Sequence, residues 1–207
     1  MLSYYVINSF LSQLEMSQGV SEEINHRIRN GTFSKYMILP ISKEGYFLAM
    51  ELGIVLFYLA FDFLAAFVWI VIFKIEFVFT KNMLVLLGAL FMNLIGMVFM
   101  VQLNYFFGIL TLKYQGIDTF LRIKNNFIAL ITGTIIPLAL FPEILVNIMK
   151  LLPFYYVSYL PAMLVTGNCR EEALLGLGII SIWCVVIQIL INIVWKSHSR
   201  KYDGVGI

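Results

Sequence analysis

The sequence predicts an all-α membrane protein, a polytopic helix bundle with about five membrane segments, the first of them partial. Two features of composition carry this prediction, because the chain of 207 residues is 61% hydrophobic and 13% charged, whereas a soluble domain carries roughly 25% charged residues. A third feature, the arrangement of the residues, agrees, because the apolar residues form long runs separated by short polar stretches. No internal repeat or linker marks a second domain, so residues 1–207 are expected to form a single transmembrane domain.

Residues 1–14 begin the chain with an apolar stretch that is too short for a complete span. A helix of this length reaches roughly 21 Å at about 1.5 Å per residue, against the ~30 Å of the hydrocarbon core. Longer apolar runs predict four further spans, over residues 46–73, 83–110, 122–141 and 174–195.

The stretch before the last span, residues 142–167, does not have the pattern of a simple span. It is broken by Pro142, Pro153 and Pro161 and is rich in tyrosine. Broken, semi-apolar pieces of this kind suit re-entrant or interfacial helices with their aromatic rings at headgroup level. We expect this region to lie on the extracytoplasmic side.

The longest polar interruption, residues 15–45, predicts a short charged helix over residues 21–31. Ser21 suits the N-cap, the two glutamates that follow place negative charge on the first turn, and Gly31 can take the left-handed C′ position. Isoleucines four residues apart give this helix a narrow apolar stripe. The side chains that define it are Glu22, Glu23, Ile24, Arg27, Ile28 and Arg29.

The basic residues predict which side of the membrane this helix occupies. We assume that residues 15–45, the 111–126 loop and the 196–207 tail share one side, which then holds ten of the 14 Lys and Arg residues. The positive-inside rule places that side in the cytoplasm. The chain is therefore predicted to be a multi-pass protein of the cytoplasmic membrane with a cytosolic C-terminus. The ten residues are Arg27, Arg29, Lys35, Lys43, Lys113, Arg122, Lys124, Lys196, Arg200 and Lys201.

The sequence lacks the motifs that indicate catalysis or cofactor binding. It contains no GxxxxGK[ST] phosphate loop, no HExxH, no cysteine cluster and no GxSxG elbow, so any ATP hydrolysis must take place on a partner. We expect no catalytic residue, no cofactor and no metal site. The basic residues are also too sparse to indicate nucleic-acid binding.

One pattern keeps an enzymatic alternative open. Residues 22–27 spell EExxxR, which resembles a motif of the CAAX-protease-like intramembrane family, whose glutamates lie within the membrane and work with histidines of later helices. Here the motif lies in a polar segment, and no later apolar segment contains a histidine. Acids at a helix start and bases at its end explain the pattern better. The alternative function is an intramembrane protease or an immunity-type membrane protein.

Polar residues inside the spans are candidates either for a translocation pathway or for contacts between helices. An acid deep in a span is costly and usually faces protein or water, and amides fit hydrogen bonds between helices. Gly96 lies on nearly the same helix face as Asn93 and Asn104, which predicts a close helix contact. Gln188 and Asn192 are four residues apart and form a predicted pair. The candidates are Asp62, Asn93, Asn104, Gln188 and Asn192.

Three stretches carry a family resemblance. Residues 23–42 combine a charged helix with Gly-Thr and then Leu-Pro-Ile, residues 133–167 contain the prolines described above, and residues 200–206 read RKYDGVG. Together they resemble the permease subunits of type-2 ABC exporters, specifically the bacterial six-span branch without a fused ATPase. Members usually have a complete first span, so the N-terminus here is expected to be a shortened one.

The resemblance implies an ATP-driven export system in which this chain moves an amphiphilic or drug-like substrate across the cytoplasmic membrane. Its expected partners are a separate ABC ATPase subunit, in two copies per transporter, a second permease copy or homologue, and membrane lipid. In such families a cytosolic coupling helix docks on the ATPase, and that role falls here on residues 21–31. A structural or regulatory membrane subunit without transport activity is a third possibility.

Overall fold

The structure is a computed structural model, and the elements of the part of the chain that it describes are all helices, as the sequence predicts. The predicted first segment and the end of the tail fall almost entirely outside that part. The described residues are 7–8, 11, 17–38, 40, 42–73, 80–114, 117–132 and 138–198.

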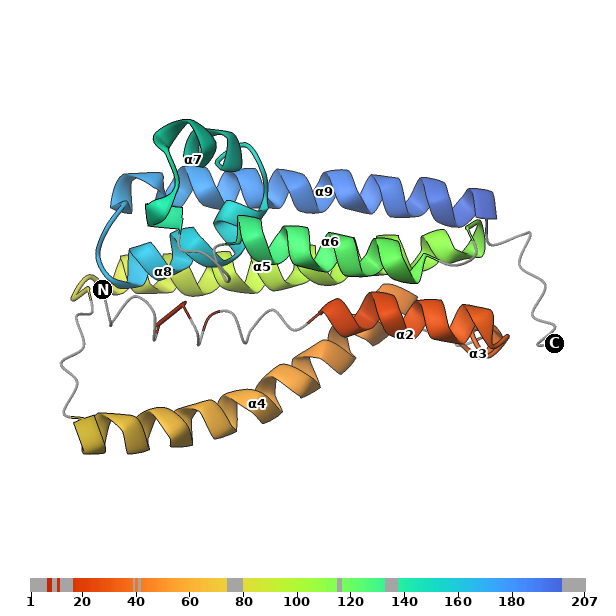
Figure 1. Cartoon of the computed structure of the whole chain (residues 1–207), viewed down its shortest axis with the longest axis horizontal. Coiled ribbons are helices and arrows are strands. Elements are labelled where there is room, and N and C mark those ends of the chain that lie inside the picture. The colour runs from red at the N-terminus through yellow and green to blue at the C-terminus, as the bar shows by residue number, and fades with distance from the viewer. Residues whose placement is uncertain are drawn as a thin grey trace.

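Three long helices form the frame of the bundle (Figure 1). Each contains a segment that is long and apolar enough to cross a membrane, because at about 1.5 Å per residue they exceed the ~30 Å hydrocarbon core. The chain is therefore a multi-pass membrane protein, and these helices correspond to three of the predicted spans. They are α4 (Lys43–Phe73), α5 (Met83–Ile109) and α9 (Ala173–His198).

α6 (Asp118–Ile131) falls where the sequence predicts a span over residues 122–141, but it begins one turn earlier. An acid in the first turn and an inward face that includes Leu121 and Ile128 explain the earlier start. The helix reaches its C-cap at Thr132, and residues 133–137 lie outside the described part.

The proline-broken region folds into short helices at one end of the bundle. They are α7 (Glu143–Met149), the π-helix η3 (Tyr155–Tyr159) and α8 (Leu160–Val165). Pro142 is the N-cap of α7 and Pro161 lies in the first turn of α8, positions where a missing N–H does little harm. A Cβ on Gly96 would lie 3.1 Å from Cα of Val157, so the predicted close contact at this glycine is confirmed. The placement of these helices relative to the membrane stays a prediction.

The two ends of the bundle differ in what they hold. α2, α3, the turn after α5 and the end of α9 lie together at one end (Figure 1). At the other end the backbone N–H of Thr80 donates to the carbonyl of Val165 at 2.9 Å, and Arg170 donates to the Thr80 hydroxyl at 3.2 Å. The charged helix therefore packs near the end of α5, at Gly108, whereas the proline-broken region contacts α5 at Gly96 and the chain before α5 at Thr80.

Candidate functional site

The charged helix, α2 (Gln18–Arg29), begins one turn earlier than the sequence predicts. Ser17 is its N-cap, whereas Ser21, the predicted cap, lies inside the helix and donates to the carbonyl of Gln18 at 3.0 Å. The extra turn buries Val20 completely, which extends the isoleucine stripe and favours the longer helix. The glutamates therefore lie in the second turn and not in the first.

The end of α2 agrees with the prediction. Asn30 is the C-cap, and Gly31 has a φ of +69°, the left-handed conformation that glycine adopts at little cost. The chain reverses here and continues into α3 (Ser34–Ile38).

The apolar face of α2 is buried against α5. Ile24 is 0% exposed and Ile28 is 8% exposed. A Cβ on Gly108 of α5 would lie 2.8 Å from Cβ of Ile24, so only glycine allows this approach. The two isoleucines, which we predicted as contacts of a coupling partner, hold α2 in the bundle.

A buried lysine joins α2, α5 and α6. Lys124 of α6 is 7% exposed and donates to the side-chain oxygen of Asn104 and, at 3.3 Å, to the hydroxyl of Ser21. Asn104 in turn donates to the hydroxyl of Ser17 at 2.9 Å. The sequence placed Lys124 in a polar loop at the membrane interface, and nothing in its local pattern indicates this burial.

A second set of polar residues forms hydrogen bonds between α2 and neighbouring elements. Asn25 donates to Oδ1 of Asp118 at 2.6 Å and accepts from the hydroxyl of Thr111 at 3.2 Å. Arg29 donates to Oδ2 of the same aspartate at 2.7 Å. α2 is therefore bonded to the start of α6 and to the turn after α5 as well as to the spans.

Another side of α2 is turned toward α3. Glu23 and Arg27, four residues apart on α2, form an ion pair at 2.5 Å, and the Arg27 guanidinium lies 5.0 Å from the centre of the Tyr36 ring. Burial alone would lower the pKa of Arg27, but the hydrogen bond and charge of Glu23 raise it. Burial, together with a hydrogen bond to Tyr46, raises the pKa of Tyr36 to about 12. This side of the helix is occupied by contacts within the chain.

Glu22 and His26, also four residues apart on α2, do not bond to each other. Glu22 accepts a long contact of 3.5 Å from Asn125 of α6, and the His26 ring lies 3.1 Å from the side-chain nitrogen of Asn30. Both Glu22 and His26 are exposed. They belong to the side of α2 that is most open to solvent among the described residues.

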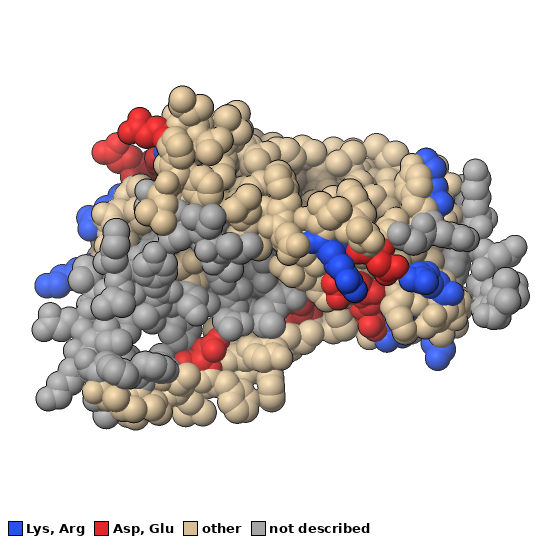
Figure 2. All heavy atoms as spheres, viewed as in Figure 1, with Lys and Arg blue, Asp and Glu red and all other residues tan. Residues whose placement is uncertain are grey.

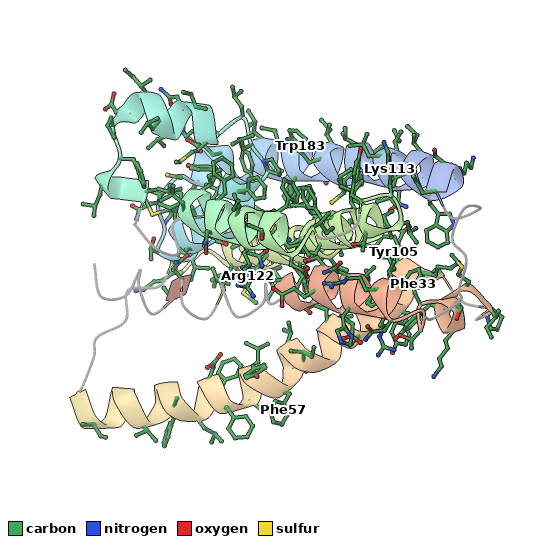
Figure 3. All side chains as sticks on the ribbon, turned by 45° about the vertical axis from the view of Figure 1, so that its right-hand side comes forward. Phe33, Phe57, Tyr105, Lys113, Arg122 and Trp183 are labelled. Carbon is green, nitrogen blue, oxygen red and sulfur yellow. The ribbon has the colours of Figure 1, made fainter. Side chains whose placement is uncertain are left out.

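That open side forms one wall of a cavity of about 400 Å³, which we call the α2–α6 cavity. The first turns of α6 form the other wall. Acidic and basic side chains gather on the surface here (Figure 2), and Arg122 extends from α6 on the side of α2 (Figure 3). The residues that line the α2–α6 cavity are Glu22, Asn25, His26, Arg29, Asn30, Asp118, Leu121 and Arg122.

The two predicted polar residues of the last span, Gln188 and Asn192, lie in different surroundings. Gln188 accepts from Gln102 of α5 at 2.6 Å and donates to Glu44 of α4 at 2.8 Å, so it joins three helices. Asn192 is exposed. The predicted pairing of these two amides gives way to contacts between helices, because one faces the bundle and the other faces outward.

The other predicted intramembrane residues differ in their surroundings. Asn104 belongs to the lysine network described above. Asn93 is 3% exposed, and its side-chain nitrogen has no hydrogen-bond partner among the described residues. Asp62 is half-buried, and its Oδ2 atom likewise has no partner in the described part of the chain. The structure does not bring Asp62 together with the charged helix.

The family model described as ABC-2 family transporter protein matches residues 1–206. No curated protein and no solved structure is significantly similar to the chain.

Proposed function

As a member of the ABC-2 family of transporter proteins, this chain is a permease subunit of an ABC transporter, and we propose that it works in ATP-driven export. The sequence contains no phosphate loop, so hydrolysis takes place on the ABC ATPase with which it pairs. The proposed substrate is amphiphilic or drug-like, because the described spans are mostly apolar and carry only a few amides and acids.

The observation that carries the proposal is that α2 is packed against, and hydrogen-bonded to, other helices of the bundle. Its apolar face packs on α5, and its polar side chains bond to residues of both α5 and α6. A push on α2 would therefore move these helices with it, as a rigid-body change. We assign to α2 the role of coupling helix, the element that docks on the ATPase.

The proposed assembly contains two ATPase subunits and a second permease, identical or homologous. The proposed location is the cytoplasmic membrane, with α2 and the C-terminus in the cytosol. The positive-inside rule supports this orientation, as does the grouping of α2, α3 and the end of α9 at one end of the bundle.

The test is co-purification of the full chain with the ABC ATPase encoded beside it, followed by reconstitution into proteoliposomes. We expect a stable complex whose ATP hydrolysis is faster than that of the ATPase alone. Inverted vesicles should also take up members of a panel of amphiphilic dyes when ATP is supplied. An ATPase that neither binds the chain nor changes its rate would overturn the proposal.

A further inference from the structure

We propose that the α2–α6 cavity receives an acidic side chain of the ABC ATPase, and that Arg29 and Arg122 bind its carboxylate. This inference rests on the proposed function, because it names the chemistry by which the same helix recognises its partner.

Among the described residues, the most exposed charged side of α2 is the one that lines the cavity. The isoleucine stripe is buried against α5, and the pair of Glu23 and Arg27 is turned toward Tyr36. The remaining charged side chains of α2, those of Glu22, His26 and Arg29, line the cavity. Since they follow one another at intervals of four and three residues, they share one helix face.

The acid at the floor of the cavity is already satisfied. Oδ1 of Asp118 accepts from Asn25 at 2.6 Å, and Oδ2 accepts from Arg29 at 2.7 Å. Both oxygens of this carboxylate are engaged and its charge is balanced by a guanidinium within the chain. Asp118 therefore offers little attraction to a basic side chain from outside.

The donors of the cavity with unused bonding capacity are its two arginines, Arg29 and Arg122. Arg122 is exposed and forms no ion pair or hydrogen bond with any described residue. Arg29 engages one nitrogen with Asp118 and keeps further N–H groups, since a guanidinium carries five. Two guanidinium groups on opposite walls of one cavity match a carboxylate, which accepts paired hydrogen bonds from arginine.

A protein side chain fits this cavity better than an anionic lipid headgroup does. Glu22 lies on the same lining, with only a long contact to Asn125, and it would repel the phosphates of a membrane surface. A protein partner can place a base opposite Glu22 while its acid enters between the arginines. The volume of about 400 Å³ accommodates the tip of a loop.

The experiment measures the affinity of the purified ATPase for the full chain in phosphatidylcholine nanodiscs. Arg122→Glu should weaken binding about ten-fold or more, because it places a negative charge where the guanidinium is proposed to bind the carboxylate of the partner. Lys35→Glu, the same charge reversal at an exposed position of α3 outside the cavity, is the matched control and should leave affinity unchanged. Arg122 has no described bond to lose, so the variant should fold, and an unchanged melting temperature checks this.

A second arm identifies the partner residue. Acidic residues on the ATPase surface are changed singly to arginine, and one of these variants should restore binding to the Arg122→Glu chain. If the wild-type chain binds and Arg122→Glu binds equally well, the inference is overturned while the proposed function stands. A loss of binding confined to nanodiscs that contain phosphatidylglycerol would assign the cavity to a lipid headgroup and also overturn it. Absence of wild-type binding would refute the proposed function itself.

Discussion

At the scale of single residues, Lys124 is the least expected feature of the molecule. Taking an ammonium group out of water is expensive unless acceptors replace the lost hydration. Here the amide oxygen of Asn104 and the hydroxyl of Ser21 are such acceptors, and they belong to different helices. The lysine therefore connects α6 to both α5 and α2, which makes it a structural joint next to the docking helix.

Replacing this lysine by methionine keeps most of its volume but removes its donors. Lys124→Met leaves a buried amide oxygen without its partner, so we expect a loss of about 1–3 kcal/mol of stability. Thermal unfolding in detergent should show a melting temperature lower by several degrees. The control is Lys113→Met, at an exposed position, for which the change should stay within about 0.5 kcal/mol. Equal melting temperatures for the two variants would show that the Lys124 network contributes nothing.

At the scale of elements, the approach of α2 to α5 depends on glycine. A Cβ on Gly108 would lie within 2.8–3.0 Å of three atoms of Ile24, one of them its Cβ. Because a Cβ cannot turn aside as the tip of a side chain can, one of the two helices would have to move. The pairing of these helices thus relies on shape as well as on the hydrogen bond from Asn104 to Ser17.

Gly108→Ala should consequently displace α2 and destabilise the protein by about 1–3 kcal/mol. Less ATPase should also co-purify, because the docking surface moves with the helix. Gly88→Ala in the same helix meets nothing within 4 Å and should be neutral or slightly stabilising, since alanine favours helix over glycine by up to about 1 kcal/mol. The comparison of the two variants in melting temperature and in pull-down yield checks the contact. A harmless Gly108→Ala would mean that α2 is not seated as described.

At the scale of the whole molecule, the two ends of the bundle are built from different structural elements. One end holds the charged helix (Figure 1), whose open side lines the α2–α6 cavity. The other holds the proline-broken helices, where Lys150 pairs with Glu172 at 2.7 Å. Much of α4 is apolar and exposed between Leu52 and Ile72, as expected for a surface that faces lipid or another membrane helix.

The proposed orientation can be tested with thiols at the two ends. Cys169 is exposed near the proline-broken end, so in a Cys184→Ala background a membrane-impermeant maleimide should label it in intact spheroplasts. Burial, and then the charge of Glu172, raise the pKa of this thiol. Labelling should therefore quicken as the pH rises, because the thiolate is the reactive form.

The matched probe for the other end is Lys35→Cys in a chain without its native cysteines. Lys35 is exposed on α3, beside the docking helix, and its replacement should be labelled only after the membrane is permeabilised. Labelling of the Lys35→Cys thiol in intact spheroplasts, with protection of Cys169, would reverse the proposed topology.

The sequence by itself determined the fold class, three of the spanning helices, the charged segment and the glycine that ends it. These features depend on local properties, namely the length of apolar runs and the residues at helix ends. The start of α2 could not be predicted from local sequence, because burial of Val20 in the core extends the helix past its expected cap.

Only the tertiary structure decided which side of α2 can meet a partner. Asn25 and Asp118 bond although 93 residues separate them, and Lys124 reaches Ser21 across 103 residues. Pairings over such distances follow from how whole helices pack, and no local pattern encodes them. For the same reason Ile24 changed from a predicted docking contact to a core residue, while Arg122 moved from a loop to the wall of the α2–α6 cavity.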